Sequence, residues 1–105
     1  MGLFDFFRID IDAGVRTAQA DETAVIVDVR EPDEYAAGHI PGSVNLPLSA
    51  PEGAKTLWPD RETPLYLYCA TGDRSMQAFR QLRAMGYRRV TNIGALKHYT
   101  GGLEK

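Results

Sequence analysis

The sequence predicts an α/β domain with a mostly parallel sheet, and two observations support this prediction. Several short runs of valine, isoleucine, leucine and tyrosine lack polar alternation, which is typical of strands buried on both faces. Segments with helical periodicity and helix-capping residues lie between these runs. Strands that alternate with helices favour parallel pairing through right-handed crossovers, so we expect helices on both faces of the sheet.

The predicted strands are short and evenly distributed along the chain. The clearest is residues 24–30, followed by residues 65–69 and residues 89–93. Residues 6–9 are a weaker fourth candidate, and residues 43–45 are a short fifth. The expected sheet therefore has about five strands.

Two helices are predicted in the first half of the chain. Asp10 is expected to cap a helix that runs to about Ala20, although Gly14 lowers its helix propensity. Pro32 suits the first turn of a second helix, whose acidic residues lie near the positive end of the helix dipole. Gly38 is predicted to end this helix.

A third helix and a short last one are predicted in the second half. Residues 74–86 place apolar side chains at steps of three, and Gly86 suits the position just beyond the helix. This apolar row consists of Met76, Phe79, Leu82 and Met85. Residues 94–102 are compatible with a short terminal helix.

Composition limits the classes of partner and the cellular setting. The 105 residues fit one domain, residues 1–105, and 44% hydrophobic content suffices for a core. A formal net charge of −2 gives no reason to expect a nucleic-acid or membrane partner, and no apolar run approaches the length of a membrane span. The first residues lack a signal-peptide pattern. A single cysteine allows neither an internal disulfide nor a cysteine-rich zinc site, so we expect a reducing, cytoplasmic setting.

Cys69 is the candidate nucleophile. It ends a predicted strand and a helix begins near Ser75, so the connection is a strand-to-helix turn at the sheet edge where ligand sites form. Gly72 lets the backbone curl, and the helix dipole and Arg74 add positive potential. These features lower a thiol pKa and favour the thiolate.

The residues between Cys69 and this helix are small or short. Ala70, Thr71 and Asp73 would leave successive backbone N–H groups free to point inward as an anion-binding nest. A buried cysteine that merely ends a core strand is the alternative, since free cysteine is among the most buried residue types. The glycine turn, the helix start and Arg74 favour the nucleophile.

Asp28 and Arg30 end the most apolar strand, so they are expected at the same sheet edge as Cys69. Asp28 is predicted to accept hydrogen bonds from neighbouring backbone or from the loop of residues 69–75, called the cysteine loop below. For Arg30 we favour a structural ion pair with Glu31 or Glu34.

The other polar residues are expected to have structural or surface roles. His39 is expected to make structural hydrogen bonds between loops rather than to act as a catalytic base. Lys97 and His98 are expected on the surface, unless the turn near Gly94 lines a pocket, where they would attract an anionic sulfur donor. The apolar residues 3–7 are expected to pack on the sheet edge.

Three segments together resemble the rhodanese family. Cys69-Ala70-Thr71-Gly72-Asp73-Arg74-Ser75 is similar to its active-site loop, Cys-x-x-Gly-x-Arg-Ser. Residues 27–48 (VDVREPDEYAAGHIPGSVNLPL) resemble the N-terminal signature, and residues 82–96 (LRAMGYRRVTNIGAL) resemble the C-terminal helix, strand and glycine turn. The resemblance covers about residues 6–103, and the order and spacing of the segments make it specific.

The resemblance implies a five-stranded sheet and sulfurtransferase chemistry. Cys69 would take the outer sulfur of a small donor, thiosulfate or a persulfide, and pass it from a persulfide to cyanide, a thiol or a protein cysteine. N–H groups of residues 70–75 would hold the persulfide. No metal or organic cofactor is implied. Many family members carry tryptophan in the last helix, where this chain has His98 and Tyr99.

Two other functions fit the same fold. Phosphatases that resemble this sheet have a Cys-x5-Arg loop, whereas Arg74 follows Cys69 after four residues and Tyr68 replaces the histidine before the cysteine. A binding or regulatory module without turnover is the second alternative, although such domains often lack the cysteine. A third possibility is arsenate or arsenite handling, or redox sensing, by the same thiol, although intramolecular disulfide cycling is excluded because there is no resolving cysteine.

Overall fold

Four parallel strands form the sheet in the computed structural model, which describes residues 9–105. They are β1 (Val25–Asp28), β2 (Val44–Asn45), β3 (Leu65–Cys69) and β4 (Val90–Ala95), in the spatial order β2-β1-β3-β4. Every pairing is parallel, which confirms the predicted fold class. The expected count of about five strands is one too high: residues 6–8 of the weakest candidate lie outside the described residues, and Ile9 belongs to no strand.

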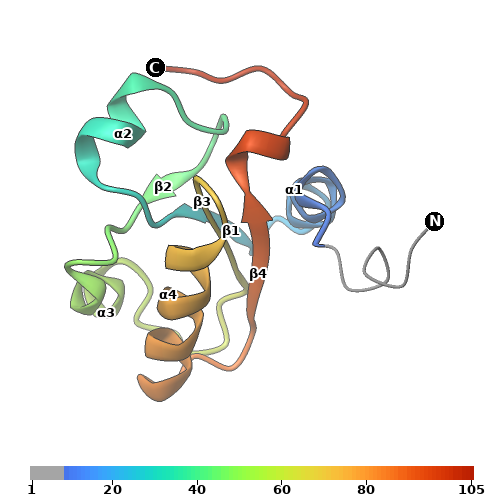
Figure 1. Ribbon diagram of the computed structural model, residues 1–105. Helices are drawn as coiled ribbons and strands as arrows, with labels where there is room; N and C mark the ends of the chain where they lie inside the picture. The colour runs from blue at the N-terminus through green and yellow to red at the C-terminus, as the bar shows by residue number, and fades with distance from the viewer. Residues whose placement is uncertain (1–8) are drawn as a thin grey trace, which may run out of the picture.

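Helices cover both faces of this sheet (Figure 1). The helix α1 (Ile11–Gln19) packs on one face, and α4 (Asp73–Ala84) and α3 (Ala54–Leu57) lie on the other. The helix α2 (Pro32–Ala37) connects β1 to β2, and 3-10 turns η2 (Pro51–Gly53) and η3 (Leu96–His98) complete the chain. Residues 94–102 therefore form a strand end and a 3-10 turn rather than an α-helix. No helix within residues 9–105 is long and apolar enough to cross a membrane.

Two hydrophobic cores lie on opposite faces of the sheet. Adjacent residues of a strand point to opposite faces, so Cys69 contributes to the core beneath α4 whereas Tyr68 contributes to the core beneath α1. Both side chains are fully buried. This alternation directs the sulfur of Cys69 toward α4 and its N-terminal loop.

The helix α1 begins and packs as its sequence requires. Asp10 caps it by accepting a hydrogen bond from the Ala13 N–H at 3.2 Å, as predicted. Gly14 faces β4, where an added β-carbon would lie 2.6 Å from Cβ of Ile93. The residue that lowers helix propensity is thus the one that lets α1 approach the sheet closely.

The other two predicted helices are also present. Pro32 is the first residue of α2, and the Glu34 carboxylate accepts the Glu31 N–H at 3.0 Å at its start. The helix α4 begins at Asp73, two residues before the predicted start, because Gly72 adopts a positive φ of 100° and turns the chain directly into the helix. It ends before Gly86, as predicted, and Gly86 has a φ of 98°.

A bulge interrupts β4 beside Cys69. Leu67 pairs with Asn92, but the next residue of β3, Tyr68, pairs with Gly94, so Ile93 is the extra residue. Gly94 has a φ of 101°, which favours glycine. The predicted strand stops at Ile93, yet β4 continues to Ala95 beyond the bulge.

The close approach at Gly14 leads to a stability prediction. Gly14→Ala gains about 1 kcal/mol of helix propensity but overpacks the contact with Ile93, at a cost of about 1–3 kcal/mol. We expect a net loss of about 1 kcal/mol in the free energy of unfolding, measured by urea denaturation. Gly102→Ala is the matched control, because no atom lies within 4 Å of its added carbon. A more stable Gly14→Ala variant would contradict the expected overpacking.

Candidate active site

Cys69 lies at the carboxyl end of β3, in the middle of the sheet. Its neighbours across the ladders are β1 and β4, and its own pairing partner is Ala95. The side chain has 0% exposure. The structure therefore places the candidate nucleophile beneath the loop that follows it.

Two backbone N–H groups converge on the sulfur of Cys69. The Gly72 N–H donates to Sγ at 2.9 Å, and the Ser75 N–H donates at 3.3 Å. Both donors reach the same atom because the chain curls at Gly72 and enters α4 at once. Such N–H donors stabilise a negatively charged sulfur more than a neutral one.

A side-chain network supports this loop from β4. The Ser75 hydroxyl lies 2.8 Å from Oδ1 of Asn92 and 3.0 Å from the Gly72 carbonyl oxygen, and the thiol of Cys69 donates to it at 3.5 Å. Oδ1 of Asn92 also accepts the Gly94 N–H at 3.0 Å. Asn92 was not among the residues predicted for the site. The signal that could have found it is a polar residue two positions before a glycine at a strand end.

Arg74 is held by Glu34 rather than left free beside the sulfur. Its guanidinium donates to both carboxylate oxygens of Glu34, at 2.6 and 2.9 Å. The hydrogen bonds from Arg74 lower the pKa of Glu34 from its ordinary 4.5 to about 2, and the same contact raises the pKa of Arg74. The positive charge that the sequence placed near Cys69 is therefore paired, and it links the cysteine loop to α2.

Asp28 and Arg30 form a buried ion pair with each other. The Arg30 guanidinium lies 2.7 Å from Oδ2 of Asp28 and also donates to the Gly38 carbonyl at 2.6 Å. Burial lowers the pKa of Arg30, but the hydrogen bonds and charge of Asp28 outweigh this effect, so the net pKa is raised.

The expected partner of Arg30 was therefore wrong. Glu34 pairs with Arg74, and the described ion pairs of Arg30 do not include Glu31. Residues two apart in extended chain point the same way, which brings Arg30 onto Asp28. Asp28 accepts the Arg30 backbone N–H at 2.9 Å, which confirms the expected bond from neighbouring backbone.

His39 makes structural contacts. Its ring stacks on that of Tyr35 with centroids 3.7 Å apart, and Nδ1 lies 2.8 Å from the Tyr35 carbonyl oxygen. Nε2 lies 3.5 Å from the Glu104 carboxylate. These contacts confirm that His39 joins loops, and none of them involves Cys69.

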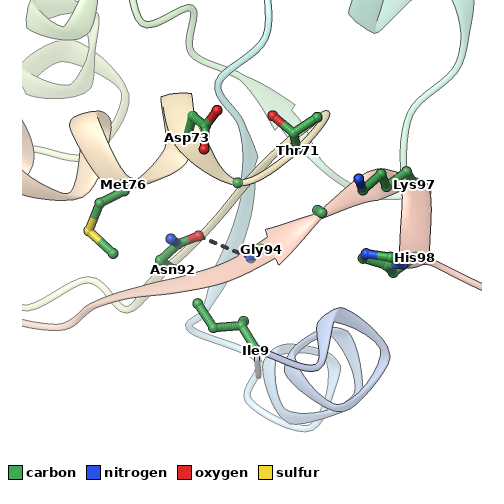
Figure 2. Close-up of a pocket in the computed structure, with 10 residues that line it drawn as sticks. Ile9, Thr71, Asp73, Met76, Asn92, Gly94, Lys97 and His98 are labelled. Carbon is green, nitrogen blue, oxygen red and sulfur yellow. Dashed lines mark hydrogen bonds between the residues drawn. The ribbon is translucent and has the colours of Figure 1, made fainter. Parts of the chain in front are cut away.

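A pocket of about 410 Å³ lies beside the cysteine loop (Figure 2). Ala95, the pairing partner of Cys69, is part of its wall. The other residues that line it are Ile9, Thr71, Gly72, Asp73, Met76, Asn92, Gly94, Lys97 and His98. The turn after Gly94 thus lines a pocket, which is the condition under which Lys97 and His98 were expected to face a ligand. Within residues 9–105, no three His, Cys, Asp or Glu side chains are grouped to hold a metal ion.

Comparison with known proteins agrees with this geometry. The model of the rhodanese-like domain family matches residues 13–105. Thiosulfate sulfurtransferase PspE of Escherichia coli is 40% identical over 72 residues, covering 68% of this chain and 69% of that protein. Thiosulfate:glutathione sulfurtransferase of Saccharomyces cerevisiae is 37% identical over 79 residues, covering 64% of this chain and 57% of that protein.

Some relatives are much longer than this chain. The chain spans 52% of a Bacillus subtilis relative at 33% identity, and 26% of the adenylyltransferase and sulfurtransferase uba4 of Ogataea parapolymorpha at 32% identity.

Solved structures with the same fold include a rhodanese with anions from E. coli and the human single-domain sulfurtransferase TSTD1. The first has a TM-score of 0.72 and 36% identity over 78% of this chain and 98% of that one. The second has a TM-score of 0.68 and 32% identity over 82% and 88%.

The pair of Glu34 with Arg74 predicts a pH-dependent contribution to stability. A depressed carboxyl pKa stabilises the fold above pH 4.5, and this contribution is lost as the pH falls from 4.5 toward about 2. Glu34→Gln should lower the free energy of unfolding at pH 7 by about 1 kcal/mol or less, because both side chains are about a third exposed. The deficit should shrink toward pH 2.

Chemical denaturation at pH 7, 4 and 2.5 measures this deficit. Glu62→Gln is the control, because Glu62 lies in a more exposed pair with Arg88 at 3.5 Å. A Glu34→Gln deficit that stays constant over this pH range would show that the charge of Glu34 is not its source.

Proposed function

The chain belongs to the rhodanese-like domain family, and we propose that it is a sulfurtransferase that carries sulfane sulfur as a persulfide on Cys69. One observation carries this proposal: two backbone N–H groups, of Gly72 and Ser75, donate to the sulfur at the carboxyl end of β3. These donors suit a nucleophile that reacts as a thiolate and whose covalent product is also anionic.

The first half-reaction loads the sulfur. The Cys69 thiolate attacks the outer sulfur of thiosulfate, a new S–S bond forms, and sulfite leaves with the electron pair of the bond that breaks. A persulfide donor loads Cys69 in the same way, with the donor's thiolate as leaving group. Gly72 and Gly94 lack side chains and Ala95 has only a methyl group, so the pocket wall nearest Cys69 is the side from which a small donor would approach in this proposal.

The second half-reaction unloads it. Cyanide, a small thiolate or a protein cysteine attacks the outer sulfur, and the Cys69 thiolate leaves. The N–H groups that hold the thiolate at the start receive the same charge again, so no rearrangement of the loop is required. This cycle uses neither a metal nor an organic cofactor.

The relatives support the proposal at the level of the reaction class. Two relatives are named thiosulfate sulfurtransferase and thiosulfate:glutathione sulfurtransferase, which supports proposing thiosulfate as the donor and a thiol as the acceptor here. Because the chain spans only part of several relatives, its donor, its acceptor and any partner protein are part of the proposal. The single cysteine favours a reducing compartment such as the cytoplasm.

The remaining predicted residues have supporting roles in this proposal. Ala70 and Thr71 belong to the turn that follows Cys69, and Asp73 begins α4. Ser75 supplies the second N–H donor to the sulfur. Asp28 orients Arg30, and Arg30 holds the end of α2 by donating to the Gly38 carbonyl.

The geometry favours sulfur transfer over phosphate hydrolysis. The Cys69-to-Arg74 loop is one residue shorter than the Cys-x5-Arg loop, and the Arg74 guanidinium is engaged by Glu34. A binding module without turnover shares the fold, but it has no need for a cysteine held by two N–H donors.

Intact-mass measurement tests the proposal directly. After incubation with thiosulfate and without reductant, the wild type should gain the mass of one sulfur atom, and cyanide should remove it. Cys69→Ala should gain nothing. A folded, reduced wild type that gains no sulfur from thiosulfate or from glutathione persulfide would overturn the proposal and favour the binding module.

A further inference from the structure

The pocket beside Cys69 carries opposite charges on two of its sides. Asp73, the first residue of α4, lies on the side of the cysteine loop, and Lys97 and His98 lie on the turn beyond β4 (Figure 2). All three side chains are exposed at the pocket rim. A ligand that enters the pocket therefore meets a cationic wall and an anionic wall.

Lys97 is placed to act on such a ligand. Within residues 9–105, its side chain forms no ion pair, whereas the nearby Arg74 is bound at both ends of its guanidinium by Glu34. The backbone N–H of Lys97 donates to the Ala70 carbonyl at 3.3 Å, which fixes the turn against the cysteine loop. Among the residues that the structure describes, the cation that faces the pocket is thus Lys97 and not the arginine of the loop.

The pocket is bounded by residues that contact or pair with Cys69, and it is larger than the smallest substrates need. Its wall includes Gly72, whose N–H is bonded to Sγ, and Ala95, which pairs with Cys69 across the ladder. Its volume of about 410 Å³ falls in the range of small-molecule sites. A compound whose sulfur reaches Cys69 still has room to place a charged group against the turn at Lys97.

We propose that Lys97, assisted by His98, is the specificity-determining residue that binds the oxyanion group of the sulfur substrate. This inference rests on the proposed sulfur transfer. The group is the sulfonate end of thiosulfate in the donor step or the carboxylate of a small thiol in the acceptor step. Asp73 acts in the opposite sense and disfavours anions.

Steady-state kinetics with Lys97→Met separate binding from chemistry. We expect the KM for thiosulfate, with cyanide as acceptor, to rise roughly threefold to fivefold, as for loss of an exposed ion pair. The kcat should stay near that of the wild type, because Lys97 does not touch the sulfur of Cys69. His98→Gln should show the same pattern with a smaller increase.

A matched series of thiol acceptors tests the acceptor step. With thiosulfate at saturation, Lys97→Met should raise the KM for 3-mercaptopropionate by a similar factor and leave that for neutral 2-mercaptoethanol unchanged. Asp73→Asn should lower the KM for 3-mercaptopropionate and raise it for cationic cysteamine. Lys55→Met is the control, because Lys55 is an exposed lysine of α3 that does not line the pocket.

The thiosulfate kinetics and the thiol-acceptor series together identify the half-reaction in which Lys97 binds its anion. An increase with thiosulfate alone assigns Lys97 to the donor, and an increase with 3-mercaptopropionate alone assigns it to the acceptor; either result supports the proposal. Unchanged KM values for both anions would overturn it. So would equal increases for 3-mercaptopropionate and 2-mercaptoethanol, which would indicate a general disturbance of the pocket.

A binding measurement keeps this test independent of turnover. Calorimetric titration of thiosulfate and 3-mercaptopropionate into Cys69→Ala measures their affinity where no persulfide can form. Adding Lys97→Met to that variant should weaken binding of at least one of the two anions roughly threefold to fivefold. If the wild type forms no persulfide but this loss of affinity is observed, the proposed function fails and the role of Lys97 as an anion site stands. If persulfide forms and the affinity for neither anion changes, the reverse holds.

Discussion

One side-chain oxygen, Oδ1 of Asn92, joins the parts of the site. It accepts hydrogen bonds from the Ser75 hydroxyl on α4 and from the Gly94 N–H beyond the bulge of β4. Gly94 is buried, so losing this acceptor would leave its N–H unsatisfied at about 1–3 kcal/mol, and the Ser75 hydroxyl would keep only the Gly72 carbonyl oxygen. The position of Ser75, whose N–H bonds the sulfur of Cys69, and the shape of the pocket wall at Gly94 depend on the same atom.

The helix α2 is held in place by polar contacts rather than by a hydrophobic face. None of its six residues, Pro32–Ala37, is buried. Its first turn is tied to the cysteine loop through Glu34 and Arg74, and its end is tied to β1 because Arg30 bonds the Gly38 carbonyl. Charge pairing at the sheet edge therefore sets where this helix lies. Salt should weaken the partly exposed ion pair of Arg74 with Glu34 more than the buried pair of Arg30 with Asp28.

How far the sequence predicts the structure depends on how local each signal is. The bounds of β3 follow from its uninterrupted apolar run, and Gly72 predicts the turn into α4. The end of β4 was placed too early, because a glycine that forms a bulge has the same sequence signal as one that ends a strand. Asn92 was missed because a single polar residue in a strand usually faces solvent, and only the fold brings Ser75 to it. Arg30 was assigned to the wrong acid, because several carboxylates lie within a few residues and sequence distance does not choose among them.

The complete burial of Cys69 also governs what the sulfur cannot react with. The chain has one cysteine, so a disulfide through it would require a second molecule to bring its own sulfur to a bond length of about 2 Å. A thiol with 0% exposure beneath its loop does not allow two folded copies to approach that closely. Small compounds that enter the pocket reach the edge of the cysteine loop, whereas a protein cysteine reaches it only on a chain end or loop that enters the pocket. The fold thus protects its reactive sulfur from covalent self-association by steric exclusion.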